Sequence, residues 1–247
     1  MIKVEREPGI VHLMIARPEK KNALTRAMYE ALADGVEEAA ADTSVHAIVI
    51  SGEGDVFTAG NDLDDFRARA SDSKPQPSAG LAFIERLMNC DTPVIAAVEG
   101  LAIGIGTTML LHVDAVITGR SARFKTAFVD LGLVPEAAST VTMPMHLGAR
   151  KAADLLLFGD TLSGEQAAAC GLASTAVDDG QATATALEKA RALTAKPREA
   201  LRASKRLMKA PWHDQAMAAL NRERDVFSER LRSDDCQQAL ARMGGKK

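Results

Sequence analysis

Three short, unbroken apolar runs constrain the fold of this chain more than any other feature. They read HAIVIS (46–51), PVIAAVEG (93–100) and DAVITG (114–119), and each ends at or beside a glycine. Apolar runs of this length, bounded by turn residues, are typical of buried strands. From Glu136 onward the sequence favours helices, with one late strand at 173–179. This order predicts an α/β fold of repeated units followed by a C-terminal helical region.

The remaining elements are predicted from turn residues and apolar spacing. Residues 2–16 indicate a hairpin around Pro8-Gly9, and Thr25 is placed to cap a helix. The polar stretch 67–80 contains two prolines and indicates a mobile loop. Two further short strands are expected to flank 122–134. Helices are expected over 81–89, 104–112, 136–147, 149–158, 163–171, 181–195, 197–209 and 213–243.

Composition and charge limit the class of protein. Of the 247 residues 47% are apolar and 26% are charged, as in a soluble globular protein with one large domain or one domain and an appendage. The net charge of -3 argues against a nucleic-acid partner. The three cysteines and five histidines are scattered, so we expect neither a disulfide framework nor a metal site.

The sequence predicts neither a targeting signal nor a membrane-spanning segment. The N-terminal residues are too charged for a secretory signal, and the last residues carry no organelle address. The longest apolar stretch, 93–111, is broken by glycines and a glutamate, which favours a buried strand and helix over a membrane span. We therefore expect a cytoplasmic protein.

Five motifs, in order along the chain, carry a family resemblance. They are RPEKKNAL (17–24), FTAGNDL (57–63), PVIAAVEGLAIGIG (93–106), DAVI (114–117) and LGLVPEAAST (131–140). Together they resemble the enoyl-CoA hydratase/isomerase superfamily, the crotonases. The resemblance implies a crotonase-like spiral of ββα repeats over 1–196 that binds CoA and holds the catalytic site. It also implies a C-terminal helical region over 197–247 that assembles a homotrimer or a dimer of trimers.

The resemblance further implies an acyl-CoA thioester substrate and no separate cofactor, since coenzyme A is part of the substrate. In crotonases two backbone N–H groups bind the thioester oxygen and stabilise an enolate, and the motif positions assign this role to Asn61 and Ile105. Small residues beside them allow the thioester to approach the backbone. The substrate-binding residues implied are Lys21, Ala23, Thr58, Ala59, Gly60, Asn61, Asp62, Leu63 and Ile105. Taken alone, each glycine-rich loop would be interpreted as a turn needed only for the fold.

The proton carriers decide the reaction. Hydratases carry two glutamates, and alignment with their motifs puts Thr108 and Phe128 at those positions, where neither can transfer a proton. The sequence is most similar to the peroxisomal-type Δ3,Δ2-enoyl-CoA isomerases, whose single catalytic glutamate corresponds to Glu136. Asp130 is the rival acid. The non-catalytic interpretation of Glu136 is a carboxylate favoured by a helix N-terminus.

The sequence thus predicts an isomerase in which Glu136 removes a proton and returns it at another carbon. Two alternatives stay open. One is another crotonase reaction, such as hydration or isomerisation of a ring-acyl-CoA, and the other is a non-catalytic CoA-binding homologue. A serine hydrolase is disfavoured because the sequence has no G-x-S-x-G segment.

Overall fold

The structure is a computed structural model that describes residues 1–71 and 77–244. Within them a six-stranded sheet forms the centre, in the order β1-β2-β3-β4-β6-β9. Its strands are β1 (Ile2–Glu7), β2 (Ile10–Ile15), β3 (Ala47–Gly52), β4 (Val94–Val98), β6 (Ala115–Gly119) and β9 (Thr175–Val177). β1 and β2 form the expected antiparallel hairpin, and the other neighbours pair in parallel. The three apolar runs are therefore β3, β4 and β6, which lie side by side.

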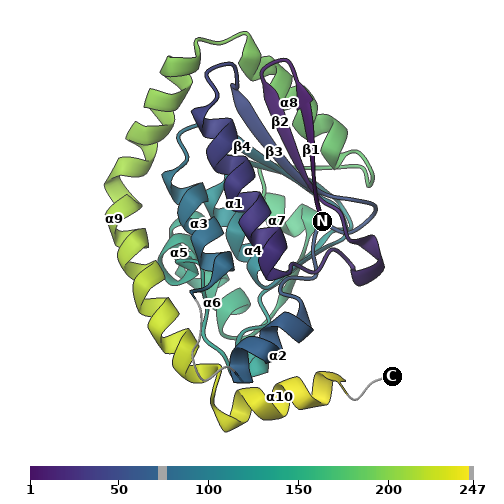
Figure 1. Cartoon of the computed structure of the whole chain (residues 1–247), viewed down its shortest axis with the longest axis vertical. Coiled ribbons are helices and arrows are strands. Elements are labelled where there is room, and N and C mark those ends of the chain that lie inside the picture. The colour runs from purple at the N-terminus through teal and green to yellow at the C-terminus, as the bar shows by residue number, and fades with distance from the viewer. Residues whose placement is uncertain (72–76, 245–247) are drawn as a thin grey trace.

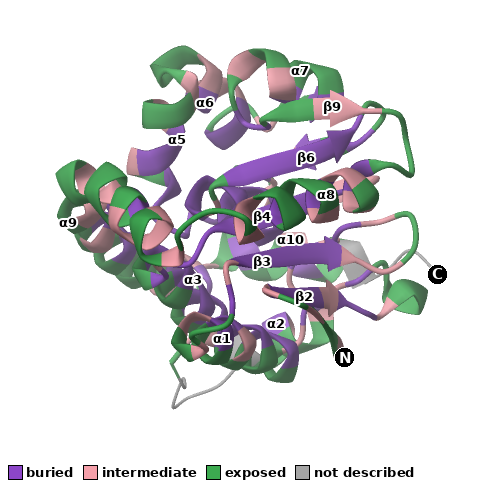
Figure 2. Cartoon of the chain, turned by 90° about the horizontal axis from the view of Figure 1, so that it is seen from above, coloured by how far each residue is buried: buried purple, intermediate pink, exposed green. Residues whose placement is uncertain are grey.

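Helices on both faces of this sheet explain why its strands are apolar throughout. Along β3, Ile48 belongs to the core shared with α1 (Arg26–Ala41) and α3 (Ala79–Asn89). Its neighbour Val49 belongs to the core under α8 (Ala182–Thr194), which crosses the other face (Figure 2). Successive side chains of a strand point to opposite faces, so a sheet covered on both sides needs apolar residues at every position.

A smaller sheet and several short helices lead from the main sheet towards the candidate site. In the described part of the chain this sheet has three strands, β5 (Leu101–Ile103), β7 (Arg123–Lys125) and β8 (Thr161–Ser163). The short helical segments are η1 (Pro18–Lys20), α2 (Leu63–Ser71), α4 (Ile105–Thr108), η2 (Met109–His112), η3 (Val129–Leu131), α5 (Ser139–Leu147), α6 (Ala149–Leu156) and α7 (Gly164–Cys170). β5, α4 and η2 follow one another closely, so the position of one fixes the next.

Two C-terminal helices run along one side of the molecule. α9 (Arg198–Arg230) packs against α3 and α5, and α10 (Asp234–Gly244) lies near α2 (Figure 1). The buried Lys205 of α9 forms an ion pair with Asp114 at 2.6 Å. The expected α/β class and the C-terminal helices are confirmed, whereas a domain boundary at residue 196 stays a prediction. No helix in residues 1–71 and 77–244 has both the length and the apolar character needed to cross a membrane.

The prediction of a mobile loop over 67–80 is wrong for its first five residues and for its last two, Ala79 and Gly80, which begin α3. Residues 67–71 are the second half of α2, whose first turn is capped by the Asp62 carboxylate. Residues 72–76 lie outside the described part of the chain. Both prolines come after the last residue of α2 and therefore leave that helix intact.

The break expected in the C-terminal helices at 210–212 is also wrong, because α9 continues through Pro211. Proline inside a helix loses one backbone hydrogen bond and costs about 3 kcal/mol. Contacts with the end of α3 on both sides of the proline hold the helix together. Lys209 donates to two backbone carbonyls there, and His213 lies 3.0 Å from the Asn89 side chain.

Of the two short strands expected to flank 122–134, only β7 forms there. Val129–Leu131 is a single 3-10 turn instead, closed by Gly132 in the left-handed region. The strand β8 was not predicted, since three residues leave too little pattern to find.

Candidate active site

Two loops that the motifs assigned to the thioester lie side by side. The Thr58 N–H donates to the Leu101 carbonyl at 2.9 Å, and the Ile103 N–H donates to the Thr58 carbonyl at 3.1 Å. Thr58 and Ala102 thereby form a parallel bridge. Asn61 and Ile105 each lie three residues beyond this pair, at corresponding positions on two adjacent chains. The pairing therefore brings the two predicted oxyanion donors to the same end of the two loops.

The backbone N–H groups of Asn61 and Ile105 donate to no group within residues 1–71 and 77–244. The bonds beside Asn61 run from Leu24 N–H to the Gly60 carbonyl, at 2.8 Å, and from Asp62 N–H to the Leu24 carbonyl, at 2.9 Å. In a parallel bridge of this kind the N–H of the central residue points away from the partner. Ile105 is the first residue of α4, whose first N–H groups have no intrahelical acceptor. Among the described residues neither N–H has an intramolecular acceptor, so both can bind an anionic oxygen.

Glycines allow these two loops to approach. Gly60 has φ of +86°, and a Cβ built on it would lie 2.6 Å from the Ile103 carbonyl oxygen. Gly104, which precedes α4, has φ of +57°. An L side chain at either position would be strained, and at Gly60 it would also push the loops apart. This explains why the Thr-Ala-Gly-Asn segment contains small residues and no side chain with obvious chemistry.

The side chain of Asn61 is held from α1. The Tyr29 hydroxyl donates to the Asn61 side-chain oxygen at 2.7 Å, and the Tyr29 ring is buried. This bond fixes the loop while the Asn61 N–H remains available. Tyr29 was not predicted as a site residue, because none of the motifs contains it.

The predicted CoA-binding segments are joined by backbone bonds beside a buried asparagine. Asn22 is fully buried; its amide donates to the carbonyls of Glu53, at 3.0 Å, and Val56, at 2.6 Å. Lys21 is exposed beside it, and its carbonyl accepts from the Ala59 N–H at 2.9 Å. Lys21 and Asn22 both adopt the left-handed region, with φ of 50° and 55°. The first CoA-binding segment therefore lies directly against the second.

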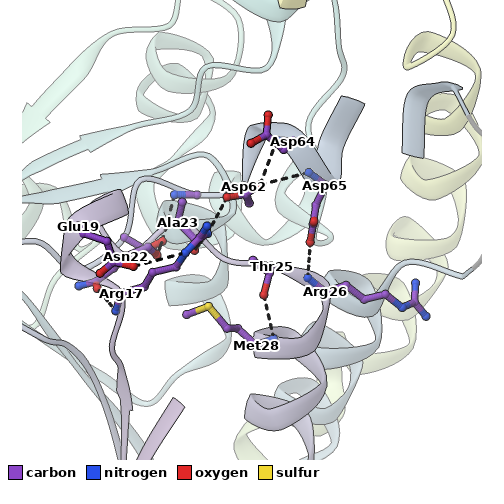
Figure 3. A network of polar contacts seen from close by, with 12 residues as sticks. Arg17, Glu19, Asn22, Ala23, Thr25, Arg26, Met28, Asp62, Asp64 and Asp65 are labelled. Carbon is purple, nitrogen blue, oxygen red and sulfur yellow. Dashed lines mark hydrogen bonds and ion pairs between the residues drawn. The ribbon is translucent and has the colours of Figure 1, made fainter. Parts of the chain in front are cut away.

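Asp62 fixes the end of this loop (Figure 3). One carboxylate oxygen accepts from Arg17 at 2.6 Å, and the other accepts from the N–H groups of Asp64 and Asp65, at 3.0 and 3.2 Å. Partial burial acts to raise the pKa of Asp62, but the bonds from Arg17 and the two N–H groups outweigh it and lower the pKa. The Asp62 side chain is thus an ionised N-cap of α2, and Arg17 is a further residue that the motif interpretation did not single out.

Glu136 lies in a turn whose backbone conformation is unusual. Its side chain is only 4% exposed. The next two residues, Ala137 and Ala138, both have positive φ, at 65° and 56°. The left-handed region costs roughly 1–2 kcal/mol for each residue that has a Cβ atom. Strain of this kind persists only where the surrounding structure holds it, and it is concentrated at functional sites.

Two buried polar side chains hold this turn. The Nε2 atom of His112 lies 2.6 Å from the Ala137 carbonyl oxygen; since a carbonyl can only accept, Nε2 carries the proton. The Glu223 carboxylate accepts from the Thr140 N–H at 2.9 Å and from the Thr140 hydroxyl at 2.5 Å. His112 ends the segment that begins at Ile105, so its bond to Ala137 connects the segment with the second oxyanion donor to the segment with Glu136.

Comparison with known proteins now places this site in a family. The family model for enoyl-CoA hydratase/isomerase matches residues 5–246. The chain belongs to this family. The solved structure of OdaA from Pseudomonas aeruginosa has a TM-score of 0.93 and 46% identity, with 99% of each chain covered.

Two named relatives add detail. The 1,2-epoxyphenylacetyl-CoA isomerase of Escherichia coli (strain K12) is 33% identical over 242 residues, which are 95% of this chain and 92% of that protein. Enoyl-CoA delta isomerase 2 of Rattus norvegicus is 31% identical over 243 residues, which are 97% of this chain but only 62% of that protein. The crotonase resemblance and fold are therefore confirmed, while the family name itself covers both hydratases and isomerases.

Within this member of the enoyl-CoA hydratase/isomerase family, the two positions that the motifs assigned to the hydratase glutamates carry no acid. Thr108 and Phe128 are both buried, at 0% and 4% exposed. The rival acid Asp130 lies on η3, where its half-exposed carboxylate pairs with Lys125 at 2.9 Å. An exposed, ion-paired carboxylate is a weak base for a buried reaction, so the geometry favours Glu136 over Asp130 as the proton carrier.

Proposed function

We propose that the protein is a Δ3,Δ2-enoyl-CoA isomerase with Glu136 as its only proton carrier. The acyl-CoA class follows from the family, and the relative named enoyl-CoA delta isomerase 2 supports the isomerase. The observation that carries the proposal is the placement of carboxylates. Glu136 is buried beside a turn with two left-handed residues, whereas the positions that the motifs assign to the two acids of a hydratase carry Thr108 and Phe128.

In the proposed reaction the thioester oxygen accepts hydrogen bonds from the N–H groups of Asn61 and Ile105. Glu136 takes a proton from C2, and the electron pair left on C2 delocalises onto that oxygen as an enolate. The pair then forms the C2=C3 double bond, the C3=C4 double bond breaks, and its π electrons bind at C4 the proton that Glu136 returns. One proton leaves and one returns, so the reaction consumes no water, oxidant or separate cofactor, and the CoA stays attached to the substrate. Each oxyanion donor is expected to lower the barrier by about 3–4 kcal/mol.

Coenzyme A is proposed to lie along the two joined segments. These comprise Lys21 and Ala23 on one side and residues 58–63 on the other. The Lys21 ammonium is exposed and is suited to a phosphate oxygen of the CoA. The proposal also includes assembly as a homotrimer or a dimer of trimers through the C-terminal helices, and a cytoplasmic location.

A second candidate is isomerisation of a ring-acyl-CoA. It is favoured by the E. coli relative named 1,2-epoxyphenylacetyl-CoA isomerase, which this chain matches over 95% of its length. Both candidates need the same oxyanion hole. A panel of 3-enoyl-CoA, 2-enoyl-CoA and epoxyphenylacetyl-CoA esters, assayed for isomerisation and hydration, separates them.

The decisive variant is Glu136→Gln, which keeps the size of the side chain but removes the basic site. Turnover of 3-enoyl-CoA is expected to fall by roughly 10²–10⁴-fold, the usual contribution of a positioned acid–base group. Exchange of the substrate C2 proton with deuterated water is expected to disappear with it. Affinity for the CoA ester should be unchanged, because other segments bind the CoA.

Asp130→Asn is the matched control, since it removes a carboxylate six residues away. It is expected to retain turnover, because Asp130 is half-exposed and paired with Lys125. If Glu136→Gln keeps most of the isomerase activity, or if Asp130→Asn loses it, Glu136 is not the proton carrier.

A further inference from the structure

We propose that Glu223, on the C-terminal helix α9, is a positioning residue that aims Glu136 by holding the left-handed turn after it. The inference rests on the proposed function, in which Glu136 is the base. The inference adds Glu223 to the proposed site. This residue lies 83 positions after its contact Thr140 in the sequence, and no motif contains it.

The contacts of Glu223 all lie at the start of α5. Its Oε1 atom accepts both the N–H and the hydroxyl of Thr140, at 2.9 and 2.5 Å. The Ala138 N–H faces the same carboxylate and acts to lower its pKa. Ala138 is the second of the two left-handed residues, and Thr140 lies in the first turn of α5. A single side chain therefore binds the first turn of α5 and lies beside the backbone of the left-handed turn that precedes it.

The turn needs an outside acceptor because its own sequence offers none. A helix is usually capped by a Ser, Thr, Asp or Asn side chain at the position before its first residue. At that position α5 has Ala138, whose methyl group cannot accept a hydrogen bond. Glu223 supplies the missing acceptor from α9, which packs along α5 (Figure 1).

The opposite side of the turn is held by His112 through the Ala137 carbonyl. The peptide group between Ala137 and Ala138 and the first turn of α5 are thus fixed from two different elements, η2 and α9. With His112 alone, Ala138 could leave the left-handed region, and the peptide after Glu136 would rotate. A displacement of about 1 Å in a reacting group can lower the rate about 10²-fold.

The test compares Glu223→Ala and Glu223→Gln with a control on the same helix. Glu223→Ala is expected to lower kcat by about 10–100-fold while KM for the CoA ester stays the same, because CoA binds elsewhere. Glu223→Gln keeps an acceptor oxygen and is expected to stay within about threefold of the parent kcat. If Glu223→Ala does not fold, Glu223→Asp is tested in its place. The aspartate carboxylate is shorter by one methylene group and is expected not to reach Thr140.

Lys209→Ala is the matched control. This mostly buried α9 side chain donates to the carbonyls of Met88 and Cys90, far along the helix from the turn. It is expected to lower the melting temperature while leaving kcat unchanged. The proposal is overturned if the folded alanine or aspartate variant keeps its kcat. It is also overturned if Glu223→Gln is as impaired as Glu223→Ala, or if Lys209→Ala loses kcat equally.

Hydrogen exchange of the backbone amides over 138–142 tests the same idea without any reaction. Exchange there should be faster in Glu223→Ala than in Lys209→Ala, and equal rates would refute the positioning role. A failed Glu136→Gln test would remove the proposed base, but the exchange result would still show whether Glu223 holds the turn. The two failures are therefore distinguishable.

Discussion

Lowering the pH from 7.5 to 5 is expected to destabilise this protein through His112, which the fold buries as a neutral ring. Burial, together with the nearby His146, outweighs the bond to the Ala137 carbonyl and lowers the pKa of His112 to about 4. In the unfolded chain a histidine has a pKa of about 6.5. Between these values the unfolded state binds a proton that the folded state does not. Stability is therefore complete above about pH 6.5 and is lost as the pH falls towards 4.

The size of the effect follows from the two pKa values. With about 6.5 unfolded and about 4 folded, linkage gives a loss of about 2 kcal/mol at pH 5 and about 3 kcal/mol once the pH is below 4. A loss of 2 kcal/mol is a large share of the stability of an ordinary domain. Protonation occurs at Nδ1 and leaves the bond from Nε2 to the Ala137 carbonyl in place, so the loss of stability comes from burying the charged ring and not from releasing the turn.

Urea unfolding at pH 7.5 and at pH 5 measures this loss, at one fixed protein concentration because assembly would shift the midpoint. His112→Gln is the matched variant: its amide can still donate to the Ala137 carbonyl, but it does not titrate. Burial also lowers the pKa of His12 and of His146, and it raises the pKa of Glu223. These groups remain in both proteins, so the parent should lose about 2 kcal/mol more than the variant between the two pH values. Equal losses would show that His112 is not the group responsible.

Two further predictions test the oxyanion hole and the assembly. Asn61→Ala keeps the N–H and loses only the bond from Tyr29, so kcat/KM should fall by no more than about tenfold. Asn61→Pro lacks the N–H and should abolish turnover in a folded protein. Equal losses in the two variants would point to a side-chain role. The tail from about residue 197 is predicted to form trimer contacts, and light scattering that finds a folded monomer at micromolar concentration would contradict this.

The main sheet could be predicted from the sequence because its signal is local and strong. The runs in β3, β4 and β6 are apolar at nearly every position, and only a sheet covered on both faces needs that pattern. Elements were missed where tertiary contacts overrode local preference. α9 continues through Pro211 because the body of the protein holds it on both sides, and no local rule contains that information.

The residues of the candidate site also fall into two groups, those that local sequence predicts and those that depend on tertiary contacts. Asn61, Ile105 and Glu136 could be found because motifs of a few residues carry them, and those motifs stand in order along the chain. Tyr29 and Glu223 could not be found. Each makes its contact across a long stretch of sequence, and each sits on a helix face where its residue type suggests an ordinary core or surface role. What distinguishes Glu223 from the other acidic residues of α9 is its burial. Burial cannot be read from a single sequence, so the sequence offered no signal for this residue.

The turn after Glu136 shows why such distant contacts matter for the chemistry. A glycine pair would adopt the left-handed region at little cost but would also leave it easily. Ala137 and Ala138 pay a conformational penalty to enter that region, so their turn exists only while His112 and Glu223 hold it. Alanine in place of glycine also restricts the alternatives open to the unfolded loop. The combination leaves the backbone beside Glu136 with few conformations, and the proposed transfer of a proton between two carbon atoms of one bound substrate requires such a fixed position. The C-terminal helix that supplies Glu223 is, on this argument, part of the proposed active site rather than only an assembly element.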